Sequence, residues 1–124
     1  MKVGKLNTLF LNATTSESMV VIGELEEHGH QFEVANSFQA ALMSLEQKVP
    51  DLIVIDASLE FSSTNALMYI RNMFDGKIAV YGERISPATS QLLSHLGVSI
   101  IVRSISDLLP MMLSETSAPA IAAA

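Results

Sequence analysis

The chain has no cysteine among its 124 residues, and charged residues make up only 16% of it. The lack of cysteine excludes disulfides, thiolate metal sites and cysteine nucleophiles. Basic residues are especially few, with 7 Lys and Arg against 13 Asp and Glu, and they form no run. This argues against binding nucleic acid by neutralising its phosphates. There is no apolar segment of the roughly 20 residues that a membrane-spanning helix needs, and no signal-peptide pattern. We therefore expect a cytoplasmic protein that binds neither nucleic acid nor membrane.

The residues that are present favour a folded core, because 49% of them are hydrophobic. The length fits a single domain. We expect that domain to cover residues 1–115. The small, nearly uncharged residues 116–124 are typical of a tail or of the start of a linker.

The most informative segment is 50–56, which opens on a proline and closes on Asp56. Every side chain from Leu52 to Ile55 is apolar, and the run is too short for a helix. Its β-branched residues and its lack of alternation predict a strand buried on both faces, as in the middle of a parallel sheet. Asp56 would then stand at the carboxyl end of that strand, the edge where ligands and chemistry collect in open α/β sheets.

The whole chain reads as five strands alternating with five helices, which predicts a doubly wound, flavodoxin-like α/β domain with strand order 2-1-3-4-5. Residues 31–35 alternate between polar and apolar and should form an edge strand. In the first helix, we expect Met19, Val20, Ile22 and Leu25 to form one buried stripe, with Glu17 in a capping box at its start. The strands are predicted at residues 6–11, 31–35, 52–56, 77–81 and 99–102.

This strand order brings the ends of the first, third, fourth and fifth strands to one edge of the sheet. The residues that converge there are Asn12, Ala13, Asp56, Gly82 and Arg103. A guanidinium can hold a carboxylate through two parallel hydrogen bonds, so we expect Arg103 to pair with Asp56.

The Pro-Asp-Leu-Ile-Val-Ile-Asp run at 50–56 follows two βα units, and Gly97 precedes a Ser-Ile-Ile-Val-Arg run that ends at Arg103. On these features the sequence resembles the receiver domain of bacterial response regulators, over roughly residues 5–114. The resemblance implies an acidic pair that binds Mg²⁺ after the first strand and a phosphorylated aspartate after the third. It further implies a Thr or Ser after the fourth strand and a Lys-Pro after the fifth.

Of these positions, only Asp56 keeps the residue type that the resemblance implies. The acidic pair is replaced by Asn12 and Ala13, the hydroxyl residue by Gly82 with Glu83 beside it, and the lysine by Arg103. Mg²⁺ prefers carboxylate oxygens, and phosphoryl transfer depends on neutralising charge. We therefore expect Mg²⁺ binding to be lost or weak, no other cofactor or metal, no enzymatic activity, and an Asp56 that is equivalent to a phosphoacceptor but inactive.

The resemblance then implies a pseudo-receiver that acts as a protein–protein interaction module in bacterial signalling, independently of aspartyl phosphorylation. The partner, or a second copy in a homodimer, would bind the fourth helix, fifth strand and fifth helix. Two alternatives stay open: a phosphorylatable receiver that uses Asp56 in an unusual pocket, and a small-molecule binder on a flavodoxin-like frame. The residues expected at the partner surface are Leu92, Leu93, Ile100, Met111 and Met112.

Overall fold

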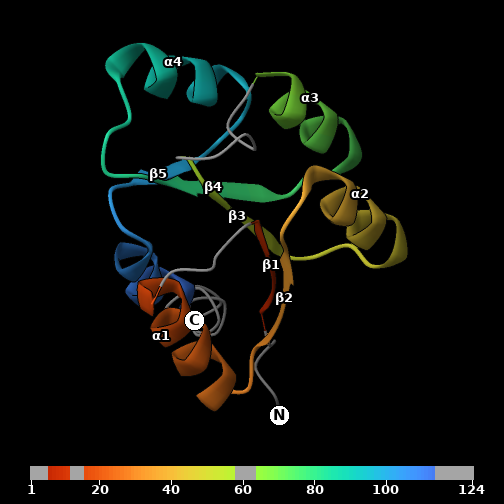
Figure 1. The fold of residues 1–124 in the computed structure, drawn as a ribbon, viewed down its shortest axis with the longest axis vertical. Helices are drawn as coiled ribbons and strands as arrows, with labels where there is room; N and C mark the ends of the chain where they lie inside the picture. The colour runs from red at the N-terminus through yellow and green to blue at the C-terminus, as the bar shows by residue number, and fades with distance from the viewer. Residues whose placement is uncertain (1–5, 12–15, 58–63, 114–124) are drawn as a thin grey trace, which may run out of the picture.

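The computed structural model of the chain describes residues 6–11, 16–57 and 64–113. Its centre is one five-stranded parallel sheet in the order β2-β1-β3-β4-β5 (Figure 1). β3 lies in the middle and is buried throughout, whereas β2 lies at an edge, as the sequence predicts. The strands are β1 (Asn7–Leu11), β2 (Gln31–Ala35), β3 (Leu52–Asp56), β4 (Lys77–Tyr81) and β5 (Ile100–Val102).

Helices cover both faces of the sheet, which confirms the doubly wound, flavodoxin-like fold. The helices are α1 (Ser16–Glu27), α2 (Phe38–Gln47), α3 (Thr64–Met73), α4 (Pro87–His95) and the 3₁₀ helix η2 (Ile105–Leu108), which continues as an α-helix over residues 109–113. We call η2 with residues 109–113 the C-terminal helical segment. α2, α3 and α4 pack on one face, and α1 and the C-terminal helical segment pack on the other (Figure 1).

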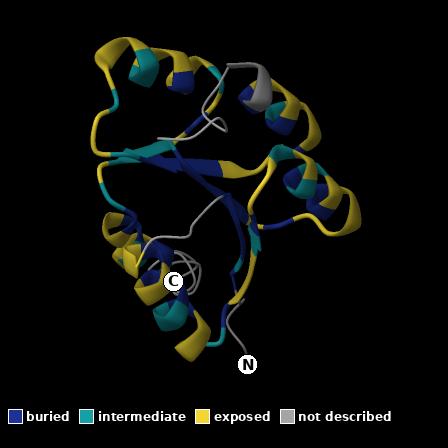
Figure 2. Cartoon of the chain, in the orientation of Figure 1, coloured by how far each residue is buried: buried dark blue, intermediate teal, exposed yellow. Residues whose placement is uncertain are grey.

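The side chains on the two faces of β3 pack into two separate apolar layers. Ile53 and Ile55 point into the layer beneath α2, α3 and α4. Leu52 and Val54 point into the layer beneath α1 and the C-terminal helical segment. Figure 2 shows the same division, with buried residues along the strands and exposed residues on the outer sides of the helices. The unbroken apolar run of β3 therefore follows from burial on both sides of the sheet.

The helix ends agree with local sequence signals. The Ser37 and Ser86 hydroxyls accept hydrogen bonds from the backbone N–H of residues three positions on, which caps α2 and α4. Pro87 stands at the start of α4, where its missing N–H leaves no hydrogen bond unmade. Gly29 and Gly97 have φ of 83° and 85°, a conformation that favours glycine, and they end α1 and α4.

The buried face of α1 differs from the predicted stripe. Met19 and Val20 are 60% and 66% exposed, so their predicted burial is wrong. α1 instead buries Ser18, Val21, Ile22 and Leu25, which recur at helical spacing. The prediction failed because it followed hydrophobicity alone, whereas the buried face includes a serine that bonds to the sheet.

Two of the five residues predicted for the partner surface lie in the core. Leu93 is fully buried on the inner side of α4. Met112 is 3% exposed on the inner side of the C-terminal helical segment, so neither residue is at a surface. Their neighbours Leu92 and Met111 are 39% and 37% exposed. Adjacent helical residues point about 100° apart, and in these two pairs Leu93 and Met112 take the side that faces the core. Ile100 is half-buried.

Within the part of the chain that the structure describes, no helix is long and apolar enough to cross a membrane.

Candidate functional site

Asp56 stands at the carboxyl end of the central strand, as the sequence predicts, and its carboxylate is buried, with 8% of the residue exposed. It pairs in register with Tyr81, the last residue of β4. Paired residues of neighbouring strands point to the same face, here the one that α1 covers. A carboxylate at such a position is costly to bury unless hydrogen bonds stabilise it.

The Tyr81 hydroxyl provides one such hydrogen bond. Burial raises the pKa of the Tyr81 phenol, while a hydrogen bond from Ser18 lowers it, and the charge of Asp56 and a hydrogen bond to Asp56 raise it again. A hydrogen bond raises a phenol's pKa when the phenol is the donor, so Tyr81 donates to the Asp56 carboxylate. The Ser18 Oγ lies 3.3 Å from the Tyr81 hydroxyl. Since Tyr81 has one proton and donates it to Asp56, we assign Ser18 as the donor in this contact. We call this directed chain, from Ser18 through Tyr81 to Asp56, the Asp56 network.

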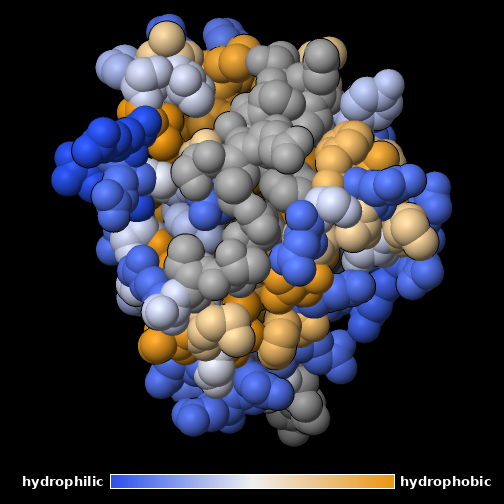
Figure 3. Space-filling view, viewed as in Figure 1, coloured by the Kyte–Doolittle hydropathy of each residue, from blue (hydrophilic) through white to orange (hydrophobic). Residues whose placement is uncertain are grey.

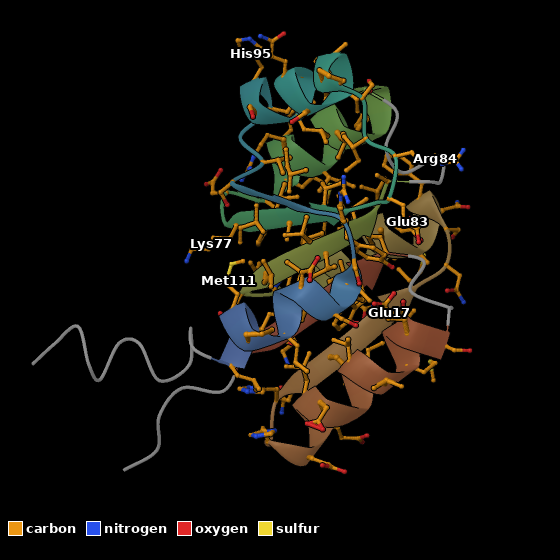
Figure 4. The ribbon with its side chains drawn as sticks, turned by 90° about the vertical axis from the view of Figure 1, so that its left-hand side faces the viewer. Glu17, Lys77, Glu83, Arg84, His95 and Met111 are labelled. Atoms are coloured by element: carbon orange, nitrogen blue, oxygen red, sulfur yellow. The ribbon has the colours of Figure 1, made fainter. Side chains whose placement is uncertain are left out.

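Next to Ser18 on α1, Glu17 makes a second set of contacts. Its carboxylate accepts hydrogen bonds from the Ser104 hydroxyl and, at 2.6 Å, from the Ser106 hydroxyl. Ser104 is also the N-cap of η2, since its Oγ accepts the Ser106 N–H at 3.1 Å. The bonds from Ser104 and Ser106 lower the pKa of Glu17. Figure 4 shows Glu17 beside the C-terminal helical segment. We call this arrangement the Glu17 clasp.

Gly82, which stands where a receiver carries its hydroxyl residue, lies in a tight space after β4. Its N–H donates to the Val102 carbonyl at 3.0 Å. A Cβ at Gly82 would lie 3.0 Å from the Cβ of Ala57 and 3.2 Å from Cγ1 of Ile85. A serine or threonine could enter only if these neighbours moved, so the glycine here also has a packing reason.

The other predicted pocket residues are dispersed. Glu83 is exposed in the turn after β4, next to Arg84, whose side chain points away from the domain (Figure 4). Arg103 is exposed just beyond β5, and its pairing with Asp56 stays a prediction. Asn12 and Ala13 lie outside the described residues. Among the residues that are described, no group of three or more His, Asp or Glu side chains could hold a metal ion.

Tyr81, Ser18 and Glu17 are the site residues that the sequence-based reasoning missed. Sequence patterns place Tyr81 only in a strand and Glu17 only in a capping box, whereas the structure gives Glu17 contacts with Ser104 and Ser106. One sequence signal does point to Tyr81: the third and fourth strands are predicted with equal lengths, so their last residues, Asp56 and Tyr81, should be neighbours.

A depression of about 440 Å³ lies at the amino edge of the sheet, and most of its lining is polar. On the face shown in Figure 3, hydrophobic residues form separate groups among hydrophilic ones. The residues that line the depression are Asn7, Glu26, His30, Gln31, Phe32, Glu33 and Lys48.

No protein-family model matches the chain, and no curated protein does. Solved structures do match. A response regulator from Thermotoga maritima has a TM-score of 0.77 at 20% identity, over 92% of this chain and 99% of that one. A two-component response regulator from Clostridium difficile has a TM-score of 0.78 at 16% identity, over 90% of this chain and 95% of that one.

A CheY-like receiver domain protein from Methanospirillum hungatei gives the same picture, with a TM-score of 0.77 at 18% identity over 92% of this chain and 95% of that one. At such low identities the likeness shows the fold alone. The chain therefore has the fold of a response-regulator receiver domain, as the sequence predicts.

Proposed function

We propose that this domain is a pseudo-receiver: a protein-interaction module in bacterial signalling whose Asp56 is engaged by the protein's own side chains instead of by a phosphoryl group. The observation that carries this proposal is the hydrogen bond from the Tyr81 hydroxyl to the buried Asp56 carboxylate. A carboxylate that accepts this bond is a weaker nucleophile toward a phosphodonor, because the hydrogen bond stabilises its negative charge. The product would place a further negative charge near the carboxylate of Glu17, which already acts on Tyr81.

The composition of the pocket supports the same proposal. Stabilising a phosphoryl group requires donors and cations aimed at its oxygens. Gly82 has no hydroxyl, and a Cβ there would crowd Ala57 and Ile85. Arg103 is the cation closest in sequence to the carboxyl end of β5, and its side chain is exposed. We propose that Mg²⁺ binding is weak or lost for the same reason.

The surface formed by α4, β5 and the C-terminal helical segment is the proposed docking site for a protein partner or for a second copy of the chain. α4 contains no Lys, Arg, Asp or Glu, and it exposes Leu92. Met111 lies on the outer side of the C-terminal helical segment (Figure 4). Interface cores are depleted in charge and enriched in methionine. α1, on the opposite face of the sheet from α4, instead carries the exposed acids Glu17, Glu26 and Glu27.

Affinity purification with mass spectrometry tests the proposal, using the wild type and Asp56→Asn, Leu92→Glu and Val20→Glu variants. Val20→Glu is the matched control, because it adds the same charge at an exposed apolar residue of α1. We expect the partner set to survive Asp56→Asn and Val20→Glu and to be lost with Leu92→Glu. Loss of partners with Asp56→Asn alone would overturn independence from phosphorylation.

A phosphorylatable receiver is the second candidate, favoured by the position of Asp56 at the carboxyl end of β3. It predicts that acetyl phosphate or beryllofluoride with Mg²⁺ changes the amide NMR spectrum and that Asp56→Asn abolishes the change. The pseudo-receiver predicts no such change with either probe.

A further inference from the structure

β2 closes one side of the sheet, and part of its backbone points away from the fold. The Gln31 N–H donates to the Leu6 carbonyl at 2.9 Å, and the whole strand stays in register with β1. In a parallel ladder, residues that bond to one neighbouring strand alternate with residues that face the other way. Gln31 and Glu33 therefore face β1. The N–H and C=O of Phe32 and Val34 face outward, where no described strand pairs with them (Figure 1).

The outer side of β2 lacks several features that keep exposed strands from pairing with other chains. Proteins often protect such strands with lysine, proline or a bulge. β2 contains no Lys, Pro or Gly, and its register with β1 has no bulge. Gln31, Phe32 and Glu33 are exposed. The strand is therefore a regular template to which an extended segment can add through main-chain hydrogen bonds.

The depression of about 440 Å³ at the amino edge follows this outer side of β2. Residues 30–33 all line it, with Glu26 of α1 on one side and Lys48, at the end of α2, on the other. The Lys48 ammonium donates to the Gln31 side chain at 3.2 Å. The carboxylates of Glu26 and Glu33 outnumber this one ammonium in the lining. The charge beside the strand therefore favours a basic side chain.

The same charge decides between a second copy of the chain and a different partner. A symmetric pair of β2 strands would run antiparallel. The register that uses both outward residues of each copy would place the two Glu33 carboxylates opposite each other, which is destabilising. A lysine or arginine opposite Glu33 is favourable instead, and the net charge of −6 attracts a basic segment.

We propose that the outer side of β2 binds an extended basic segment of a partner protein, which adds as a strand and places a lysine or arginine opposite Glu33. Glu33 points to the α2 side, where it accepts the Ser44 hydroxyl at 2.7 Å. Val34 packs on the α1 side, and Phe32 shares that side, so the alternate residues of the segment are apolar. β2 and β5 are the two outermost strands of the sheet, so this site is separate from the docking surface at α4 and β5 and does not rest on it.

NMR titration of the full chain with two synthetic peptides tests the proposal. Both peptides are about eight residues long, and valine alternates with lysine in one and with glutamate in the other. We expect the lysine peptide to slow hydrogen exchange of the Phe32 and Val34 amides and to leave exchange at Gln31 and Glu33 unchanged. This alternation identifies an added strand, because binding through side chains alone would not follow it.

Variants test the charge and the main-chain contact separately. We expect the lysine peptide to bind about fivefold more tightly than the glutamate peptide, and Glu33→Lys to reverse the preference. Glu46→Lys is the matched control, because it makes the same change at an exposed residue of α2 outside the depression and should keep the preference. Phe32→Pro removes an outward N–H and should abolish binding, whereas Phe32→Ala keeps that N–H and should still bind the lysine peptide.

Equal affinities for the two peptides would overturn the proposal, and so would Phe32 and Val34 amides whose exchange the lysine peptide does not slow. Slowing of these amides with rising protein concentration, in the absence of peptide, would also overturn it, because a second copy would then be the occupant. The exchange measurements and the comparison of peptides use the wild type, so the test does not depend on the folding of any variant.

Discussion

The two edges of the sheet use polar side chains in different ways. At the amino edge, most polar side chains bind the backbone, although the Lys48 ammonium donates to the Gln31 side chain at 3.2 Å. The Arg71 guanidinium donates to the carbonyls of Phe74, Gly76 and Gly97, at 2.8, 2.7 and 3.2 Å. At the carboxyl edge, side chains around Asp56 bind one another.

Two further contacts at the amino edge follow the same rule. Nδ1 of His30 accepts the Leu6 N–H at 3.0 Å. The Asp51 carboxylate accepts the Asn7 N–H at 2.9 Å, while the Asp51 N–H donates to the Asn7 carbonyl at 2.7 Å. Contacts to backbone depend only on the path of the chain. Contacts between side chains require several residue types at once. Substitutions can therefore remove or change a function at the carboxyl edge while the fold is kept.

The largest loss of stability is expected for Arg71→Met, which removes a charged donor from three carbonyls at the entrances to β4 and β5. Hydrogen bonds to charged groups contribute about 1.5 to 3 kcal/mol, and we expect a loss of about 2 to 3 kcal/mol in the free energy of unfolding. Urea denaturation measures it. Arg84→Met is the control, since Arg84 is exposed in a turn, and it should change stability by less than about 0.5 kcal/mol. Equal losses in the two variants would contradict the role given to Arg71.

His30→Leu should have the second-largest effect. It leaves the buried Leu6 N–H without this acceptor, at a cost of about 1 to 3 kcal/mol, and should speed hydrogen exchange of the Leu6 amide. The contact also requires that the proton of the neutral imidazole sit on Nε2, which ¹⁵N NMR of the ring can verify. His95→Leu is the control at an exposed position on α4. A ring protonated on Nδ1 would contradict this assignment.

Sequence patterns predicted the frame well because its determinants are local. The apolar run of β3, the Ser86-Pro87 start of α4 and the glycine that ends it each act within a few residues. The site was harder to predict because its contacts are between segments distant in sequence. Ser18 is buried because Tyr81, 63 positions later, bonds to it, and nothing within α1 signals that partner.

At the carboxyl edge, we expect Ser18→Ala to cost about 1 kcal/mol, less than either amino-edge variant, because Tyr81 keeps its bond to Asp56. Its sharper effect is on Tyr81. The bond from Ser18 lowers the pKa of the phenol, so its loss should raise that pKa further above the ordinary value. Absorbance titration at alkaline pH measures the shift. The chain has two tyrosines, so a Tyr69→Phe background isolates the signal. A lower Tyr81 pKa in Ser18→Ala would reverse the donor order of the Asp56 network.

The smallest effect is expected at the Glu17 clasp, which is exposed to solvent and screened by it. We expect Glu17→Gln to cost only about 0.5 kcal/mol at pH 7. The hydrogen bonds from Ser104 and Ser106 lower the folded-state pKa of Glu17 below its ordinary value of 4.5. The stabilisation is therefore fully present above pH 4.5 and is lost as the pH falls through the folded-state value.

The difference in unfolding free energy between wild type and Glu17→Gln should accordingly shrink on acidification, as measured by urea denaturation from pH 7 downward. The corresponding difference for Arg71→Met serves as the reference, because the three partners of Arg71 are backbone carbonyls, which do not titrate. A Glu17 difference that stays constant with pH would mean that the carboxylate charge contributes nothing to the clasp. The clasp would then depend only on neutral hydrogen bonds, and its contrast with the Arg71 contacts would be lost.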